Sequence, residues 1–188
     1  MEHPYVQYGN IHFIPVVRRR LSFAVLVQRA VDSFKEPPLG RRDLVAAALP
    51  QSVAGSVTTA IAKLPAISLV VASVPGVPQR EAFAVTPCDG MVEAIRIALE
   101  HGIPWRCIEP EIAPGFLGDR PCVDANWPDD TLAVERGAER YLDLVQGLLA
   151  GPLDRCDPAD AGRELYIAEQ LRSLRPRYNR ILCVCDVA

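Results

Sequence analysis

Several features that define large classes of protein are missing from this sequence of 188 residues. No apolar run approaches the roughly 20 residues that a membrane-spanning helix needs. The net charge of −3 gives no general attraction to nucleic acid or anionic lipid. Neither of the glycine-rich motifs that bind nucleotide phosphates occurs after a predicted strand. These absences argue against a membrane span, a nucleic-acid partner and a nucleotide cofactor, and we expect a soluble, cytoplasmic protein.

Histidine is scarce, with three residues, whereas cysteine is not, with six. Six cysteines could form three disulfide bridges. However, Cys107, Cys183 and Cys185 lie in apolar, strand-like runs, where a free thiol packs as a small hydrophobic group. We expect the thiols of Cys183 and Cys185 to point to opposite faces of a strand, which would prevent both from binding one metal ion. The sequence therefore favours free thiols in a reducing compartment.

The apolar residues are spaced so that predicted strands alternate with predicted helices. The strands are predicted at 5–17, 44–49, 67–73, 83–85, 105–108 and 180–184, and the helices at 21–34, 51–63, 91–101, 128–149 and 159–174. The run at 67–73 predicts a strand buried on both faces. Because crossovers between parallel strands are right-handed, this order predicts an α/β fold with a mainly parallel β-sheet and helices on both faces, a three-layer α/β/α arrangement.

The length of the chain suits one domain, residues 1–188. The apolar run ILCVCDVA at 181–188 ends in residues that would lie at the ligand-binding edge of a parallel sheet. We therefore expect the chain to be the N-terminal part of a longer parent protein.

His12 is the first candidate for a functional residue. It follows Gly9 in the spacing Gly-x-x-His, and we place it at the end of the first strand. An imidazole there could bind a metal ion or act as a base, although a metal site needs further ligands. The alternative is a loop or core histidine that is hydrogen-bonded to a backbone carbonyl.

Two further candidates come from later in the chain. Glu109 follows the strand predicted at 105–108, at the edge where parallel sheets bind ligands. Arg163 could bind a substrate carboxylate or stabilise developing negative charge. The alternatives are a solvated loop carboxylate and an ordinary salt bridge on a helix surface. Asp89 is better explained as a helix N-cap, and Glu111 is a further candidate partner for His12.

Five short motifs in combination resemble the TraB and Tiki-like family, within the superfamily of erythromycin esterases and ChaN-like haem-binding proteins. They are GNIH at 9–12, LVAAALPQ at 44–51, DGMVEAIRIALE at 89–100, the helix that contains Arg163, Glu164 and YIA at 166–168, and ILCVCDVA at 181–188. The chain departs from the family pattern in two places. Ala48 stands where the pattern has Glu before Leu-Pro, and Asp186 stands where it has the Gly of a second Gly-x-x-His.

The resemblance implies ancestry as a metal-dependent peptidase or an esterase. His12, Glu109 and Arg163 would then be the catalytic residues, and His12 would bind a divalent metal. Ala48 cannot transfer a proton or bind a metal, which leaves it open whether the chain is an enzyme. The alternative is a non-catalytic binding or regulatory module of the same fold, with a small-molecule or peptide ligand. A haem site with His12 as axial ligand is a third hypothesis.

Overall fold

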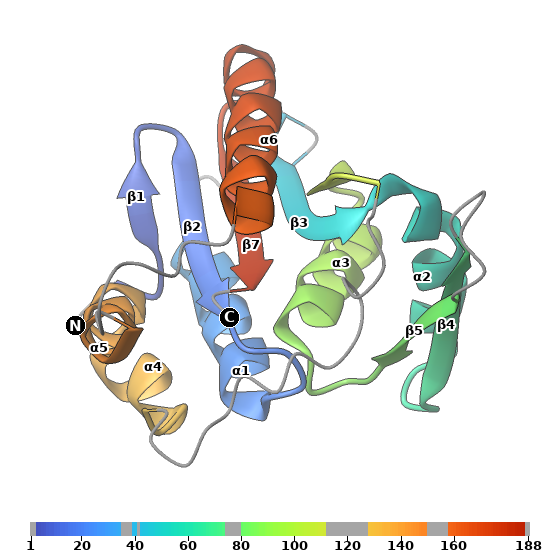
Figure 1. The fold of residues 1–188 in the computed structure, drawn as a ribbon, viewed down its shortest axis with the longest axis horizontal. Coiled ribbons are helices and arrows are strands. Elements are labelled where there is room, and N and C mark those ends of the chain that lie inside the picture. Colours follow the sequence, from blue (N-terminus) through green and yellow to red (C-terminus); the bar gives the residue numbers. More distant parts are fainter. Residues whose placement is uncertain are drawn as a thin grey trace.

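A five-stranded sheet, in the order β1-β2-β7-β3-β6, forms the centre of the molecule (Figure 1). The computed structural model describes residues 3–34, 39–40, 42–73, 80–111, 128–149 and 158–186. The strands of the sheet are β1 (Val6–Tyr8), β2 (Ile11–Val16), β3 (Leu44–Pro50), β6 (Trp105–Glu109) and β7 (Ile181–Asp186). Only β1 is antiparallel to its neighbour. The predicted α/β fold with a mainly parallel sheet is therefore confirmed.

Helices lie on both faces of this sheet. Two of them, α1 (Leu21–Ser33) and α3 (Gly90–His101), pack against each other behind it, and α6 (Pro158–Leu174) lies in front (Figure 1). Next to α1 and β2 lie α4 (Thr131–Arg136) and α5 (Ala138–Leu149). Two short 3-10 helices, η1 (Gln51–Val53) and η2 (Arg175–Arg177), complete the turns. No helix in the described part of the chain is long and apolar enough to cross a membrane.

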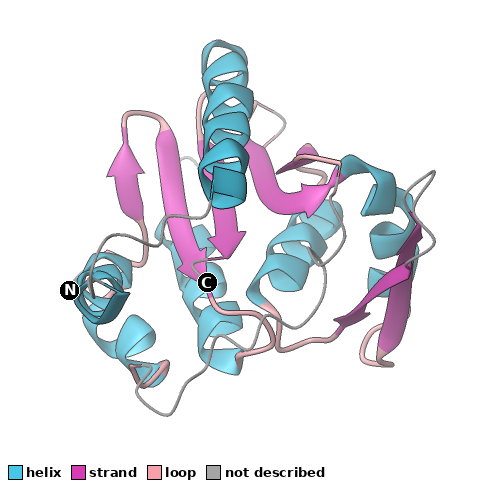
Figure 2. Ribbon diagram, in the orientation of Figure 1, coloured by secondary structure: helices cyan, strands magenta, loops and turns pink. Residues whose placement is uncertain are grey.

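The strand predicted at 67–73 has a different place from the one expected. It is β4 (Ser68–Ser73), which pairs antiparallel with β5 (Arg80–Val85) in a separate two-stranded sheet beside α2 (Ala54–Ile61) (Figure 2). Val70 is buried, but Leu69 and Val71 are exposed. The prediction of burial on both faces is wrong, because α2 packs on the hairpin while Leu69 and Val71 stay exposed, and an apolar run does not reveal how many sides are covered.

Local signals in the sequence explain the ends of several elements. The Asp89 carboxylate accepts hydrogen bonds from the backbone N–H groups of Met91 and Val92, which makes it the N-cap of α3, as predicted. Gly102 ends α3 with a positive φ of 63°. The single helix predicted at 128–149 is instead two helices, because Gly137, at φ 84°, separates α4 from α5.

Gly90, the first residue of α3, lets this helix approach α1 and β2 closely. A Cβ atom at Gly90 would lie 2.8 Å from Cγ1 of Val16 and 3.3 Å from the backbone carbonyl carbon of Phe23. We expect Gly90→Ala to lower the free energy of unfolding by about 1–3 kcal/mol, because the packed backbone must move. Gly55→Ala in α2 is the matched control, since a Cβ atom added at Gly55 would have no neighbouring atom within 4 Å.

Gly55→Ala should leave the free energy of unfolding unchanged or raise it by about 0.5–1 kcal/mol, because alanine favours the helix. Urea unfolding of both variants measures the difference. Equal urea midpoints for Gly90→Ala and the wild type would contradict the close approach at Gly90.

Candidate functional site

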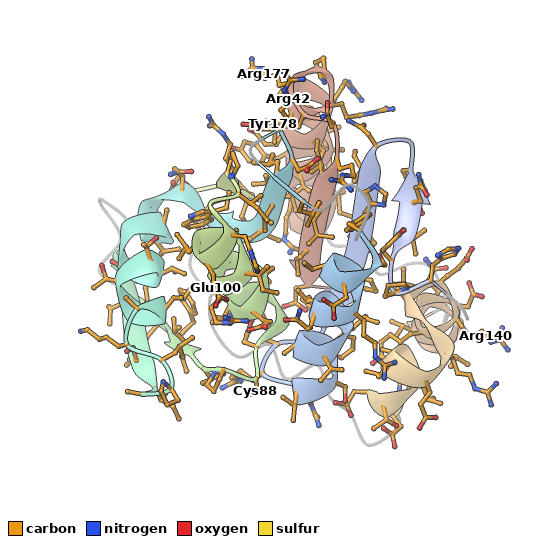
Figure 3. The ribbon with its side chains drawn as sticks, turned by 180° about the vertical axis from the view of Figure 1, so that it is seen from behind. Arg42, Cys88, Glu100, Arg140, Arg177 and Tyr178 are labelled. Carbon is orange, nitrogen blue, oxygen red and sulfur yellow. The ribbon has the colours of Figure 1, made fainter. Side chains whose placement is uncertain are left out.

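His12 lies at the amino end of the sheet and not at the carboxyl end where the sequence placed it. It is the second residue of β2 and pairs with Leu182 near the start of β7. The predicted strand 5–17 is in fact a hairpin, because Gly9, at φ 65°, and Asn10 turn the chain between β1 and β2. In Figure 3, Arg42 and Tyr178, which precede β3 and β7, mark this end of the molecule, and Cys88 lies at the opposite end.

The His12 side chain is packed among aromatic rings. It is 6% exposed, and its ring makes edge contacts with the rings of Tyr5 and Phe34, each at a centroid distance of 4.7 Å. Its Nδ1 atom is buried and has no hydrogen-bond partner among the described residues. Burial and the charge of Arg180 lower the pKa of His12 below its ordinary value, and the opposing effect of Asp43 is smaller.

These surroundings do not fit the divalent metal that the resemblance implies at His12. The carboxylate that acts electrostatically on His12, Asp43, is bound by the Arg180 guanidinium through contacts of 3.1 Å from Nε and 2.9 Å from Nη2. The Phe34 ring and the protonated Arg180 guanidinium offer a metal no ligand, and the Asp43 oxygens are already engaged by Arg180. Nowhere within the described ranges do three or more His, Cys, Asp or Glu side chains gather as a metal site would require.

Glu109 and Arg163, by contrast, lie together at the carboxyl end of the sheet. Glu109 is the last residue of β6, and its side chain is completely buried. The Arg163 guanidinium donates from Nε to Oε1 of Glu109 and from Nη2 to Oε2, the latter at 3.4 Å. Burial works to lower the pKa of Arg163, but the hydrogen bond and charge of Glu109 outweigh it and raise that pKa. Two of the three predicted catalytic residues thus form one ion pair.

The spacing of residues along α6 explains why Arg163 points to the sheet. Ile167, Leu171 and Leu174 pack against the core, and they follow Arg163 at intervals of four, four and three residues. Side chains at these intervals share one face of a helix. Most other described side chains of α6 are exposed, among them Leu165 and Tyr166. Among the side chains of α6 that the structure describes, Arg163 therefore continues the stripe that contacts the rest of the molecule.

His12 is too far from this ion pair to share a substrate with it. It lies on β2, three strands from β6, and strands are spaced by about 4.8 Å. Along the strands, His12 is level with Val45 through Leu182, whereas Glu109 is level with Pro50, a further rise of about 16 Å. The two side chains are consequently separated by roughly 20 Å.

The thiols of Cys183 and Cys185 complete this part of the molecule. Their sulfur atoms are 3.5 Å apart, and both side chains are buried. The expectation that they point to opposite faces is wrong, because residues two apart in a strand share a face. The charge of Cys185 acts on Arg163 and the charge of Glu109 acts on Cys183, so the four groups are close. We call Glu109, Arg163, Cys183 and Cys185 the carboxyl-edge cluster.

The remaining candidates have structural roles. Besides capping α3, Asp89 accepts a hydrogen bond of 2.8 Å from Nε of Arg18, the residue two positions after β2. Glu111 accepts from the backbone N–H of Ser52 at 2.8 Å. Ala48 is buried in β3 and has no carboxylate. The buried carboxylate at this edge of the sheet is that of Glu109, from β6. The sequence analysis did not identify the thiol pair as a site. The Cys-x-Cys spacing within a predicted strand could have identified it, because residues two apart share one face.

Comparison of the chain with protein-family models, with curated proteins and with solved structures finds no match in any of the three. Any functional proposal for this chain therefore rests on the geometry of the described residues.

The lowered pKa of His12 leads us to predict how the stability of the fold depends on pH. Between the folded-state pKa and the usual value of 6.5, the unfolded chain binds more protons than the folded one. Stability is therefore highest above pH 6.5 and decreases as the pH falls through 6.5 toward the folded-state pKa. In His12→Leu this component of the acid sensitivity should be absent, as measured by urea unfolding at about pH 8 and about pH 5.

His101→Gln, at the exposed end of α3, is the control and should keep the pH dependence of the wild type. An unchanged pH dependence in His12→Leu would mean that the folded state does not hold His12 neutral.

Removal of one partner from the Glu109–Arg163 pair should be costly. Arg163→Met leaves the Glu109 carboxylate buried without its counter-charge, and we expect a loss of about 3 kcal/mol in the free energy of unfolding. Glu109→Gln combined with Arg163→Met should lose less, because no buried charge is left. Arg140→Gln is the control on α5, where Arg140 pairs with Asp143 in an exposed contact worth at most about 1 kcal/mol.

A double-mutant cycle from urea unfolding gives the coupling energy of the pair. A coupling no larger than that of Arg140 and Asp143 would contradict the buried ion pair.

Proposed function

We propose that the chain is a binding module of α/β fold, a non-catalytic relative of the TraB and Tiki-like family, that recognises a carboxylate on a small molecule or peptide. The observation that supports this proposal is the bidentate ion pair of Glu109 and Arg163 at the carboxyl end of β6. In parallel sheets, ligands bind at the carboxyl ends of the strands.

The ion pair gives Arg163 the properties of a recognition residue. A guanidinium is a planar fork that matches a carboxylate, and it binds best when its orientation is fixed beforehand. Glu109 fixes that orientation through two contacts, and its own side chain is completely buried. The Arg163 side chain keeps 17% of its area exposed, so a ligand approaching this edge of the sheet meets the arginine and not the glutamate.

The positions of His12 and Ala48, which the family resemblance relates to catalysis, favour binding over hydrolysis. A general base must lie within hydrogen-bond distance of the group it deprotonates, or reach it through one water. His12 lies roughly 20 Å from Glu109, by strand spacing and register. Ala48 has no group that exchanges a proton. Both carboxylate oxygens of Glu109 are already engaged by Arg163.

Carboxylate binding is tested by the thermal unfolding midpoint in acetate, succinate or citrate, at constant ionic strength. A carboxylate present at about 100 times its Kd should stabilise the folded state by about 2.7 kcal/mol, which raises the midpoint by about 5–10 °C. The shift should be absent in Glu109→Gln combined with Arg163→Gln, which removes the guanidinium without leaving a buried charge. Arg140→Gln should keep the shift.

Two results would overturn the proposal. The first is a midpoint that none of the three carboxylates raises, or that they raise equally in the Glu109→Gln, Arg163→Gln double variant. The second is hydrolysis of p-nitrophenyl acetate by the wild type that is lost in Glu109→Gln. That second result would establish the hydrolase hypothesis in its place.

A further inference from the structure

The paired thiols of β7 have a geometry that the proposed binding function does not use. The sulfur atoms of Cys183 and Cys185 are 3.5 Å apart on one face of a strand that is hydrogen-bonded on both sides, to β2 and to β3. The neighbouring residue on β3 that shares the face of Cys183 is Ala46, whose methyl group is short. The backbone therefore holds the two thiols in contact.

The two thiols differ in their surroundings. Cys183 is completely buried, whereas Cys185 keeps 7% of its area exposed. The hydrogen-bond contact with Cys185 raises the pKa of Cys183 well above its ordinary value, with burial and the charges of Cys185 and Glu109 adding to the effect. Cys185 also lies close enough to Arg163 to interact with its guanidinium electrostatically. Cys185 is thus the more reachable of the two thiols.

We propose that Cys183 and Cys185 form a peroxide-reactive dithiol, in which Cys185 reacts first with hydrogen peroxide and Cys183 then closes an intramolecular disulfide. Hydrogen peroxide is the oxidant because it is small enough to reach a thiol with so little exposed area. This proposal stands on the thiol geometry and does not require the carboxylate ligand.

The reaction balances in two steps. The Cys185 thiolate attacks one oxygen of hydrogen peroxide, so that an S–O bond forms, the O–O bond breaks and hydroxide leaves. The Cys183 sulfur then attacks the sulfenic sulfur of Cys185, so that the S–S bond forms and the S–O bond breaks. The protons of the two thiols convert the departing oxygens to two molecules of water. The two sulfur atoms together lose two electrons, and the peroxide gains them.

The strand also determines how easily the disulfide is reduced again. Residues two apart in a strand have Cα atoms about 6.4–6.8 Å apart, from the rise per residue. This is the long end of the range that a disulfide spans. We expect such a bond to be readily reduced, as in regulatory disulfides, and not to be a permanent crosslink.

Peptide mapping tests the proposal on the wild-type protein. Trypsin cleaves after Arg180, so both thiols lie in the one peptide that begins at Ile181. After mild treatment with hydrogen peroxide and blocking with N-ethylmaleimide, this peptide should have lost two hydrogen atoms and carry no maleimide. Its oxidation should be at least about tenfold faster than that of Cys107, whose pKa burial raises to about 12. Dithiothreitol should restore both thiols.

Variants test the order of the two steps. In Cys183→Ser, peroxide should still oxidise Cys185, to a sulfenic acid that dimedone traps. In Cys185→Ser, Cys183 should stay reduced under the same conditions. Far-ultraviolet circular dichroism checks that each variant is folded. Equal oxidation of Cys183 in Cys185→Ser and in the wild type would overturn the assigned order.

A second measurement uses the reduced wild type, so it needs no variant to fold. Phenylarsine oxide bridges two adjacent thiols, and it should protect both cysteines of the peptide that begins at Ile181 from N-ethylmaleimide. Failure of phenylarsine oxide to protect them, together with a peptide that stays reduced in peroxide while Cys107 oxidises, would overturn the dithiol.

Discussion

The pairing of β7 with both β2 and β3 is the constraint on which the rest of the structure depends. β7 comes last of the strands in the sequence, yet it occupies the middle of the sheet and joins the β1–β2 hairpin to the β3–β6 pair. Every contact between these two halves of the sheet is thus made across a long separation in sequence. Such contacts form late, because the loop that they close must be ordered first. Residues 181–185 are all buried, which is the apolar signature of a strand covered on both faces.

Each of the buried carboxylates described around this sheet forms an ion pair with an arginine from another part of the chain. Asp43 pairs with Arg180, Asp89 with Arg18, and Glu109 with Arg163.

A buried carboxylate without such a partner would shift its pKa or destabilise the fold. The first pair joins the starts of β3 and β7, and the second joins the end of β2 to the start of α3. The third joins a helix to a strand at the carboxyl end of the sheet, which is why it is the pair on which the proposed function is based.

The sequence was enough to predict most helices and strands and the α/β class, because apolar spacing and caps are local signals. Asp89 as an N-cap and Gly102 as a helix end are examples. The order of strands in the sheet is not a local property, so neither the central place of β7 nor the separate hairpin of β4 and β5 could be predicted.

The site was predicted only in part, for the same reason. Glu109 and Arg163 were both candidates, but their pairing depends on how α6 crosses the sheet. His12 was placed at the wrong end, because a single strand at 5–17 and a hairpin turning at Gly9 and Asn10 have the same apolar content. The thiol pair could have been predicted from the sequence, since residues two apart in a strand share a face.

The weak attachment of α6 ties the carboxyl-edge cluster to the dynamics of the molecule. The described part of α6 contacts the rest of the chain through one stripe, in which Arg163 is the only charged side chain beside three apolar ones. Segments with few buried contacts open at a lower free energy than the core. A change in charge or bonding beneath Arg163, whether at Glu109 or at the thiols of β7, therefore acts on a helix that few buried side chains hold in place. In this fold, the carboxyl-edge cluster and the attachment of α6 to the sheet are one set of interactions.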